Sequence, residues 1–122
     1  MKIIIAGSRY YDDYEQAKAF IDKCIADNCR DKKLTFLSGG CNGADMIGER
    51  YARENGYPLT RYSAQWGKYG KRAGPIRNMK MAEDCDIVIC FWDGKSRGTQ
   101  SLISYANKNG VPIFIQYIEP KE

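Results

Sequence analysis

The 122-residue chain contains no histidine. This absence excludes the usual Ser–His–Asp and Cys–His nucleophile systems, in which an imidazole acts as the base. It also removes the side chain that most often binds transition metals. Acid–base chemistry would have to use carboxylates, lysine, tyrosine or cysteine. We therefore expect neither a bound metal ion nor a resident cofactor.

The chain also lacks C-x-x-C spacing, and its five cysteines are an odd number. Both features argue against a disulfide framework and against a zinc site built from cysteine pairs. We expect free thiols, most of them buried as small apolar side chains. Cys41 differs from the others because it lies in a glycine-rich loop.

Long apolar runs are missing as well. The longest runs, residues 3–6 and 87–92, are far shorter than the ~18 residues of a membrane span. The chain does not begin with a basic segment, an apolar stretch and a small-residue cleavage site, so no secretory signal is predicted. We expect a cytoplasmic protein with no membrane partner.

Strand-like and helix-like patterns alternate along the chain. Residues 2–6 are mostly β-branched, and residues 87–92 are continuously apolar, as in a strand buried on both faces. In residues 12–28 the apolar side chains recur at intervals of three and four, which predicts a helix. Further strands are expected at residues 34–37, 58–62 and 111–117, and further helices from Asn42 or Gly43 to 55, from Pro75 onward and at 98–109.

This alternation predicts βαβ units and a single-domain α/β fold. We expect a Rossmann-like three-layer sandwich with a mainly parallel sheet of about five strands and, because crossovers are right-handed, helices on both faces. The domain should span residues 1–118, and residues 119–122 should form a frayed tail.

The net charge is modest, +4 from 19 Lys and Arg against 15 Asp and Glu. Such an excess does not by itself imply nucleic-acid binding. Residues 68–77 carry four cations and no acid, and further cations lie in other glycine-containing loops. Cations gathered in loops favour capture of a small anion. Because a chain of this size and charge offers little extended basic face, we do not expect a nucleic-acid partner.

The loops that follow the predicted strands are unlike the rest of the chain. In open parallel sheets, ligands bind outside the carboxyl ends of the strands. Residues 7–9, 38–45, 63–74 and 93–99 occupy these positions and are rich in glycine, hydroxyl groups, aromatic rings or cations. We therefore predict one ligand site formed by these loops.

Two of these loops have features of anion cradles. Gly39, Gly40 and Gly43 precede a predicted helix, whose N-terminal N–H groups and dipole favour phosphate. The loop lacks the G-K-[ST] ending of a Walker A motif and the G-x-G-x-x-G pattern, so a mononucleotide-sized ligand is favoured over a dinucleotide. The alternative is that these glycines only make a tight turn. Ser96, Gly98 and Thr99, with Arg97 beside them, form a second predicted cradle.

For other residues in these loops, the sequence allows two interpretations each. Trp66 could stack a base, or it could simply pack its own loop. Arg77, near a predicted helix start, opposes the helix dipole and suggests a bound anion; it could equally be exposed without a partner. Asp45 could cap its helix or contact a ribose hydroxyl. The candidate ligand-binding residues are Gly7, Ser8, Arg9, Gly39, Gly40, Asn42, Gly43, Asp45, Trp66, Arg77, Asn78, Asp93, Ser96, Arg97, Gly98 and Thr99.

Four segments together resemble the YspA-type branch of the SLOG superfamily. They are I-I-I-A-G-S-R, S-G-G-C-N-G-A-D, W-G-K-Y-G-K-R-A-G-P-I-R-N-M-K-M and F-W-D-G-K-S-R-G-T, in register over nearly the whole chain. The resemblance implies a Rossmann-like nucleotide-binding domain in the cytoplasm of a prokaryote, or of a host cell if the chain is phage-encoded. It also implies a homo-oligomer, most simply a dimer.

The resemblance also bears on catalysis. The related LOG phosphoribohydrolases carry R-x-x-x-M, matched here by Arg77 and Met81, and P-G-G-x-G-T-x-x-E, whose glutamate acts at the glycosidic bond. The present chain keeps Gly98 and Thr99 but has Leu102 at the glutamate position. We therefore expect binding of a phosphorylated nucleotide or nucleotide-derived metabolite, as a sensor or sequestering protein without turnover. The alternative is an N-glycosidase that acts on nucleoside monophosphates or ADP-ribose-like nucleotides, in which Asp93 or Asp45 replaces the glutamate and Arg77 assists.

Overall fold

The structure, a computed structural model, describes residues 1–120. Two residues of the predicted frayed tail, 121 and 122, lie outside the described residues. Within the tail, the backbone carbonyl of Glu119 accepts a hydrogen bond from the Tyr10 hydroxyl at 3.1 Å.

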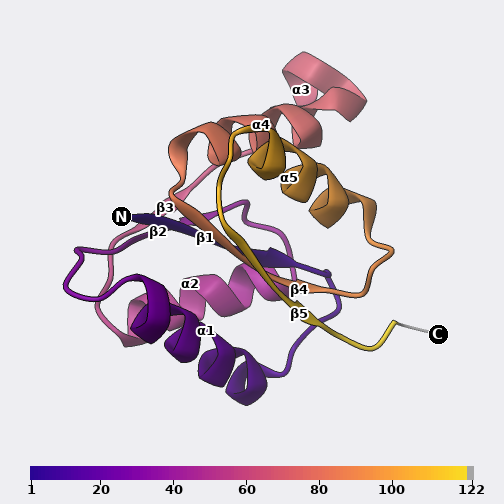
Figure 1. The fold of residues 1–122 in the computed structure, drawn as a ribbon. Helices are drawn as coiled ribbons and strands as arrows, with labels where there is room; N and C mark the ends of the chain where they lie inside the picture. The colour runs from indigo at the N-terminus through magenta and orange to yellow at the C-terminus, as the bar shows by residue number, and fades with distance from the viewer. Residues whose placement is uncertain (121–122) are drawn as a thin grey trace.

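Five parallel strands form one sheet in the order β3-β2-β1-β4-β5 (Figure 1). β1 and β4 lie at its centre, where Ile3 pairs with Ile87 and Gly7 with Phe91. Both strands are runs of β-branched and apolar residues, which suit a strand covered on both faces. The strands are β1 (Lys2–Gly7), β2 (Thr35–Ser38), β3 (Leu59–Arg61), β4 (Ile87–Trp92) and β5 (Ile113–Tyr117).

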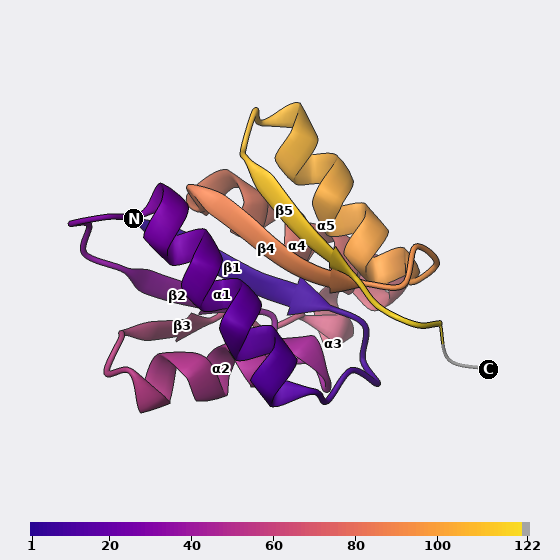
Figure 2. The same cartoon turned by 60° about the horizontal axis from the view of Figure 1, so that its bottom comes forward.

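Helices cover both faces of the sheet. α1 (Tyr14–Asn28) and α2 (Ala44–Glu54) lie on one face, and α4 (Ala73–Asp84) and α5 (Arg97–Lys108) lie on the other (Figures 1 and 2). The predicted Rossmann-like three-layer sandwich is therefore confirmed.

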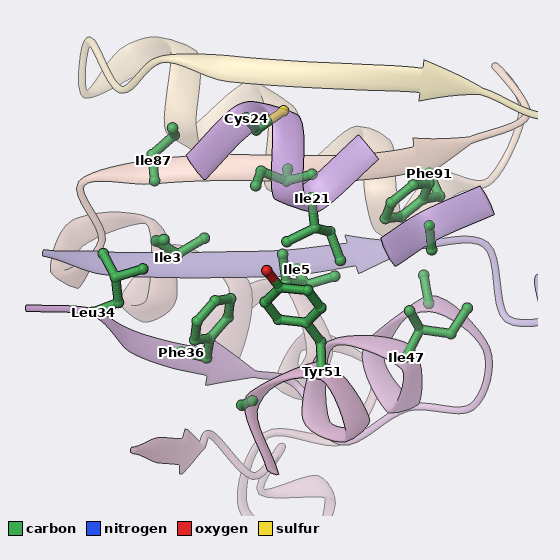
Figure 3. Packing of buried hydrophobic residues seen from close by; sticks show 14 of the residues in the cluster. Ile3, Ile5, Ile21, Cys24, Leu34, Phe36, Ile47, Tyr51, Ile87 and Phe91 are labelled. Atoms are coloured by element: carbon green, nitrogen blue, oxygen red, sulfur yellow. The ribbon is translucent and has the colours of Figure 1, made fainter. Parts of the chain in front are cut away.

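Alternation along the central strands divides the core into two layers. Ile3 and Ile5 of β1 pack with α1 and α2, as Figure 3 shows, whereas Ile4 and Ala6 pack with α4 and α5. All four side chains are buried. Because successive side chains of a strand point to opposite faces, one apolar run supplies both layers.

The segment before α4 differs from the sequence prediction. The expected loop contains a short helix, α3 (Trp66–Tyr69), and a 3₁₀ turn, η1 (Gly70–Arg72), and α4 begins at Ala73. Pro75 is therefore the third helical residue and not the first. Its missing N–H costs nothing there, since the first-turn N–H groups of a helix have no intrahelical acceptor. Arg77 accordingly lies in the second turn of α4, beyond the strongest part of the helix dipole.

The strand order places the functional loops together. From the centre, the chain extends through β1 and β2 toward one edge of the sheet and through β4 and β5 toward the other. The carboxyl ends of β1 and β4 are the topological switch point, where open parallel sheets bind ligands. No helix in the part of the chain that the structure describes has the length and apolar character needed to cross a bilayer.

Candidate functional site

A pocket of about 330 Å³ opens at the carboxyl ends of β1, β2 and β4. This volume lies at the lower end of the range for small-molecule sites. The loops after β1, β2 and β4 line it, together with residues of α2, α4 and α5. The lining residues are Ala6, Gly7, Arg9, Tyr10, Gly39, Cys41, Asp45, Arg77, Asn78, Met81, Ser96, Arg97, Gly98, Thr99 and Leu102.

Most of the residues predicted from the sequence meet in this pocket. They come from the ends of β1, β2 and β4 and from α2, α4 and α5: Gly7, Arg9, Gly39, Asp45, Arg77, Asn78, Ser96, Arg97, Gly98 and Thr99. Six other predicted residues do not line it, namely Ser8, Gly40, Asn42, Gly43, Trp66 and Asp93.

Ser8 and Gly43 join two loops beneath the pocket. Ser8 is fully buried, and its hydroxyl is 3.1 Å from that of Ser96. Its carbonyl accepts the Ala44 N–H at 3.2 Å. A Cβ on Gly43, whose φ is +79°, would lie 2.3 Å from this carbonyl oxygen. The glycine is therefore needed for the close approach of the loops and does not face the ligand space.

Two N–H groups in the loop after β2 donate to the end of that strand and to the helix that follows the loop. Gly40 donates to the Ser38 hydroxyl at 3.0 Å, and Cys41 donates to the Asp45 carboxylate at 3.1 Å. Gly40 packs against the Arg61 side chain, since a Cβ there would be 2.9 Å from Cδ of Arg61. Asn42 is exposed. The N–H groups of Gly40 and Cys41 are therefore not available to an anion.

The N–H groups in the first turn of α5 donate no hydrogen bond within the helix. Gln100 is the first residue to donate within the helix, to the Ser96 carbonyl at 3.1 Å. The N–H groups of Arg97, Gly98 and Thr99 precede it and have no intrahelical acceptor. All three residues line the pocket, so this helix N-terminus supplies the backbone donors and the favourable dipole end for an anion.

Asp93 shapes the loop that leads into α5. Its carboxylate accepts the N–H groups of Lys95 and Ser96, both at 2.8 Å, and the Tyr10 hydroxyl at 2.7 Å. Burial raises the pKa of Asp93, but these three hydrogen bonds outweigh it and lower the pKa to about 2. Asp93 is therefore a fixed anion that holds the loop and lies outside the pocket lining.

Arg77 is held at the pocket wall by three neighbours. Its Nη1 donates to the Gly39 carbonyl at 2.7 Å, and its Nε donates to the Asn78 side-chain oxygen at 3.0 Å. Asn78 in turn donates to the Gly98 carbonyl at 3.2 Å, which ties α4 to the start of α5. Nη2 lies 3.8 Å from the Cys41 sulfur. The guanidinium is thus oriented before any ligand binds.

Asp45 is a buried carboxyl close to Arg77, only 7% exposed; a Cβ on Gly39 would lie 2.9 Å from Oδ2 of Asp45 and 3.0 Å from Nη1 of Arg77. Burial raises its pKa from 3.8 to about 6, although the Cys41 N–H and the Arg77 charge lower it. Asp45 therefore carries a proton more readily than an ordinary carboxyl. Among residues 1–120 it is the one carboxylate that lines the pocket, and the charges of Arg77 and Arg9 act on it.

Some lining residues were not among the predicted site residues: Ala6, Tyr10, Cys41, Met81 and Leu102. Leu102 is 2% exposed and packs with Ile4 and Ala106 in the α4/α5 core layer, so it forms part of an apolar wall. Leu102 occupies the glutamate position of the G-T-x-x-E pattern, and this position was the sequence signal that could have placed it in the site. The apolar pattern alone does not distinguish a core residue from one at a pocket wall.

Comparison with known proteins identifies the family. Residues 1–69 match the family described as the YspA, cpYpsA-related SLOG family. The chain belongs to this SLOG family. It is also 32% identical over 120 residues to the Gene 61 protein of Mycobacterium phage D29, which covers 92% of this chain and 93% of that protein. Membership of the SLOG family supports a role in binding a nucleotide-related ligand.

Two solved structures share the fold. DNA processing protein A from Helicobacter pylori superposes with a TM-score of 0.71 at 20% identity, over all of this chain and 66% of that chain. The structural-genomics target TM1055 superposes with a TM-score of 0.64 at 16% identity, over 92% of this SLOG chain and 71% of that one.

One of these structures corrects an expectation. The Helicobacter protein is described by its single-stranded DNA binding mode. The expectation of no nucleic-acid partner, drawn from size and modest net charge, is therefore wrong. A chain that shares this fold binds single-stranded nucleic acid, and net charge averages over the whole surface and misses local clusters of cations.

Proposed function

We propose that the pocket binds a phosphorylated nucleotide or a nucleotide-derived metabolite. The observation that carries this proposal is the convergence of Arg9, Arg77 and Arg97 with the free N–H groups of the α5 first turn. Phosphate groups take charge-assisted hydrogen bonds from guanidinium groups and from helix N-termini. The apolar wall at Met81 and Leu102 would contact the base or sugar.

We propose further that the ligand is held without being cleaved, so that the protein acts as a sensor or a sequestering protein in the cytoplasm. Departure of a base through an oxocarbenium-like state needs a nearby carboxylate or nucleophile. Leu102 supplies neither. Asp93 is engaged by three hydrogen-bond donors and does not line the pocket.

A second candidate function is N-glycoside hydrolysis with Asp45 as the acid. The observation that favours it is the pKa of about 6 of a buried carboxyl that lines the pocket. General acids work best when their pKa lies near the operating pH. Asp45, rather than Asp93, would then be the catalytic residue.

The likeness to the Helicobacter protein extends the ligand class. Its single-stranded DNA binding supports a nucleotide within a single strand as a ligand, besides a free nucleotide.

The expected homo-oligomer, most simply a dimer, stays a prediction that light scattering would test.

Replacing Arg77 tests the anion site. Titration calorimetry would compare nucleoside 5′-monophosphates and ADP-ribose on the wild type and on Arg77→Ala. Loss of a charge-assisted contact should weaken binding by about 1.5–3 kcal/mol, or roughly 10- to 150-fold. The matched control is Arg30→Ala, an exposed arginine before β2, at the amino end of the strands. Equal affinity in wild type and Arg77→Ala would refute the site.

Turnover is tested by chromatography of the bound ligand. Excess nucleotide is incubated with the protein and analysed before and after denaturation, and we expect it to be recovered intact. Release of free base over many turnovers, lost in Asp45→Asn and kept in Asp93→Asn, would contradict binding without turnover and support the glycosidase activity.

A further inference from the structure

One long stretch of the chain carries several cations and no acidic residue. Residues 55–82 contain no aspartate or glutamate, although the whole chain has 15. Six cations lie in this stretch: Arg61, Lys68, Lys71, Arg72, Arg77 and Lys80. The modest net charge therefore conceals one segment of concentrated positive charge.

The fold presents part of this stretch as an exposed surface. α3 and η1 stand beyond the end of α4, away from the sheet (Figure 1), and neither contains a buried residue. Trp66, Lys68, Lys71 and Arg72 are all exposed. We call these four residues the α3–η1 platform.

Trp66 is anchored at one edge and open elsewhere. A Cβ on Gly74 would lie 3.6 Å from Cη2 of the ring, so Trp66 rests against the start of α4. The side chain is nevertheless 57% exposed, which is unusual for so large an apolar group. Two residues further along α3, the Lys68 ammonium lies 5.1 Å from the centre of the Tyr69 ring. An exposed indole flanked by cations is a surface suited to a flat, anionic partner.

Arg77 lies between the pocket and the segment that carries the platform. This residue lines the main pocket and also a small hollow between α3 and α4, together with Tyr69, Ile76 and Lys80. A ligand that leaves the pocket past Arg77 would meet Tyr69 and then the α3–η1 platform.

We propose that the α3–η1 platform is a binding site for single-stranded nucleic acid. In this proposal, which rests on the proposed function, one nucleotide occupies the pocket and the strand continues over the platform. Lys68, Lys71 and Arg72 contact the backbone phosphates, and Trp66 stacks on a base. Single strands fit because their bases are free to stack on aromatic side chains, whereas paired bases in a duplex are not.

Fluorescence anisotropy with 5′-phosphorylated dT12 tests the stacking contact. Stacking of one base on one aromatic side chain accounts for about a 5- to 150-fold gain in affinity, so Trp66→Ala should lose that factor. Tyr117→Ala removes a similarly exposed aromatic side chain from β5, at an edge of the sheet, and should bind as the wild type does. The double variant Lys71→Ala/Arg72→Ala should reduce the slope of log K against log salt by about 1.4.

A second readout follows Trp66 directly. Trp92→Phe leaves Trp66 as the single tryptophan, and its fluorescence should be quenched on titration with dT12. Equal affinity of Trp66→Ala and wild type for dT12 would overturn the proposal. So would a 12-base-pair duplex that binds as tightly as dT12, or a wild type that binds dT12 no more tightly than 5′-dTMP.

Binding of 5′-dTMP separates this proposal from the proposed function. Trp66→Ala should bind 5′-dTMP within twofold of the wild type, whereas Arg77→Ala should not. If Arg77→Ala loses 5′-dTMP while Trp66→Ala keeps dT12, the pocket stands and the platform fails. If Trp66→Ala loses dT12 while Arg77→Ala leaves 5′-dTMP binding unchanged, the platform stands and the pocket fails.

Discussion

Asp45 lines the pocket, and its burial there disfavours the ionised form of its carboxyl group. It is buried among pocket residues, and its one hydrogen bond from the chain comes from the Cys41 N–H. The charges of Arg77 and Arg9 favour the ionised form, but burial outweighs them. A buried carboxyl in this situation favours its protonated form, which explains the pKa of about 6.

This raised pKa predicts a stability difference that depends on pH. The folded protein keeps a proton on Asp45 that the unfolded chain releases above pH 3.8. The stabilisation is thus complete below about pH 4 and is lost as the pH rises through about 6. Asp45→Asn removes this ionisation, so its free energy of unfolding should exceed that of the wild type by up to about 3 kcal/mol at pH 7.5 and by little at pH 4.

Urea unfolding followed by circular dichroism, between pH 4 and pH 7.5, would measure this difference. Other carboxyls titrate equally in both proteins, so the difference between the two curves isolates Asp45. Parallel curves would mean that Asp45 is ionised at its ordinary pKa.

At the scale of elements, α2 is fixed to its neighbours through a buried carboxylate. Glu49 of α2 accepts hydrogen bonds from the Ser38 hydroxyl at 2.7 Å and from Nε of Arg61 at 3.0 Å. Burial raises the pKa of Glu49, but Arg61 and Ser38 outweigh it and lower the pKa. Ser38 also accepts the Gly40 N–H. The ends of β2 and β3 and the loop behind the pocket are thereby held to one helix.

The contact between the loops after β1 and β2 is tested by comparing two glycines. Gly43 and Gly56 both have a positive φ, +79° and +72°, but a Cβ would meet the Ser8 carbonyl only at Gly43. Gly56→Ala should cost about 1–2 kcal/mol of unfolding free energy, the penalty of the left-handed conformation. Gly43→Ala should cost about 4 kcal/mol or more, because the two loops must also move apart.

Chemical denaturation of both variants at one pH would measure the two costs. Nucleotide affinity should fall in Gly43→Ala and stay unchanged in Gly56→Ala, because Arg9 follows Ser8 in the displaced loop. Equal costs in the two variants would mean that the loop contact is not tightly packed.

At the scale of the whole molecule, the pocket joins the two sides of the sheet. Arg9 and Asp45 come from the β1–α1 loop and from α2 on one side, and Arg77 and Thr99 come from α4 and α5 on the other. A ligand that contacts both sides binds only the folded chain, so it should raise the stability of the entire domain.

A thermal shift assay tests this linkage. A nucleoside monophosphate at about 100 times its Kd should add about 2.7 kcal/mol and raise Tm by roughly 10 °C. The same concentration should give a much smaller shift with Arg77→Ala. The matching nucleoside without phosphate is the control. A nucleoside that stabilises as well as its monophosphate would show that the phosphate is not recognised.

Patterns in the sequence predicted the five strands and the four main helices in their order, and one ligand site at the carboxyl ends of the strands, but not α3 and η1. Period-2 and period-3.6 patterns are local, so they indicate elements such as Ile87–Trp92 without knowledge of their neighbours. Parallel strands carry their carboxyl ends to one edge, so the loops rich in glycine and cations could be assigned to one pocket. The leucine at position 102, in place of a glutamate, was also visible in the sequence.

The fold was needed to show which of these groups line the pocket. Asp45 and Asp93 both follow strands, but hydrogen bonds within its own loop and from Tyr10 occupy Asp93, while burial leaves Asp45 at the pocket wall. Likewise, the N–H of Ala44 is used by Ser8, whereas those of the α5 first turn are not used within the helix. Tyr10 and Asp93, like Ser8 and Ala44, are distant in sequence, and only folding brings such partners within the roughly 3 Å of a hydrogen bond.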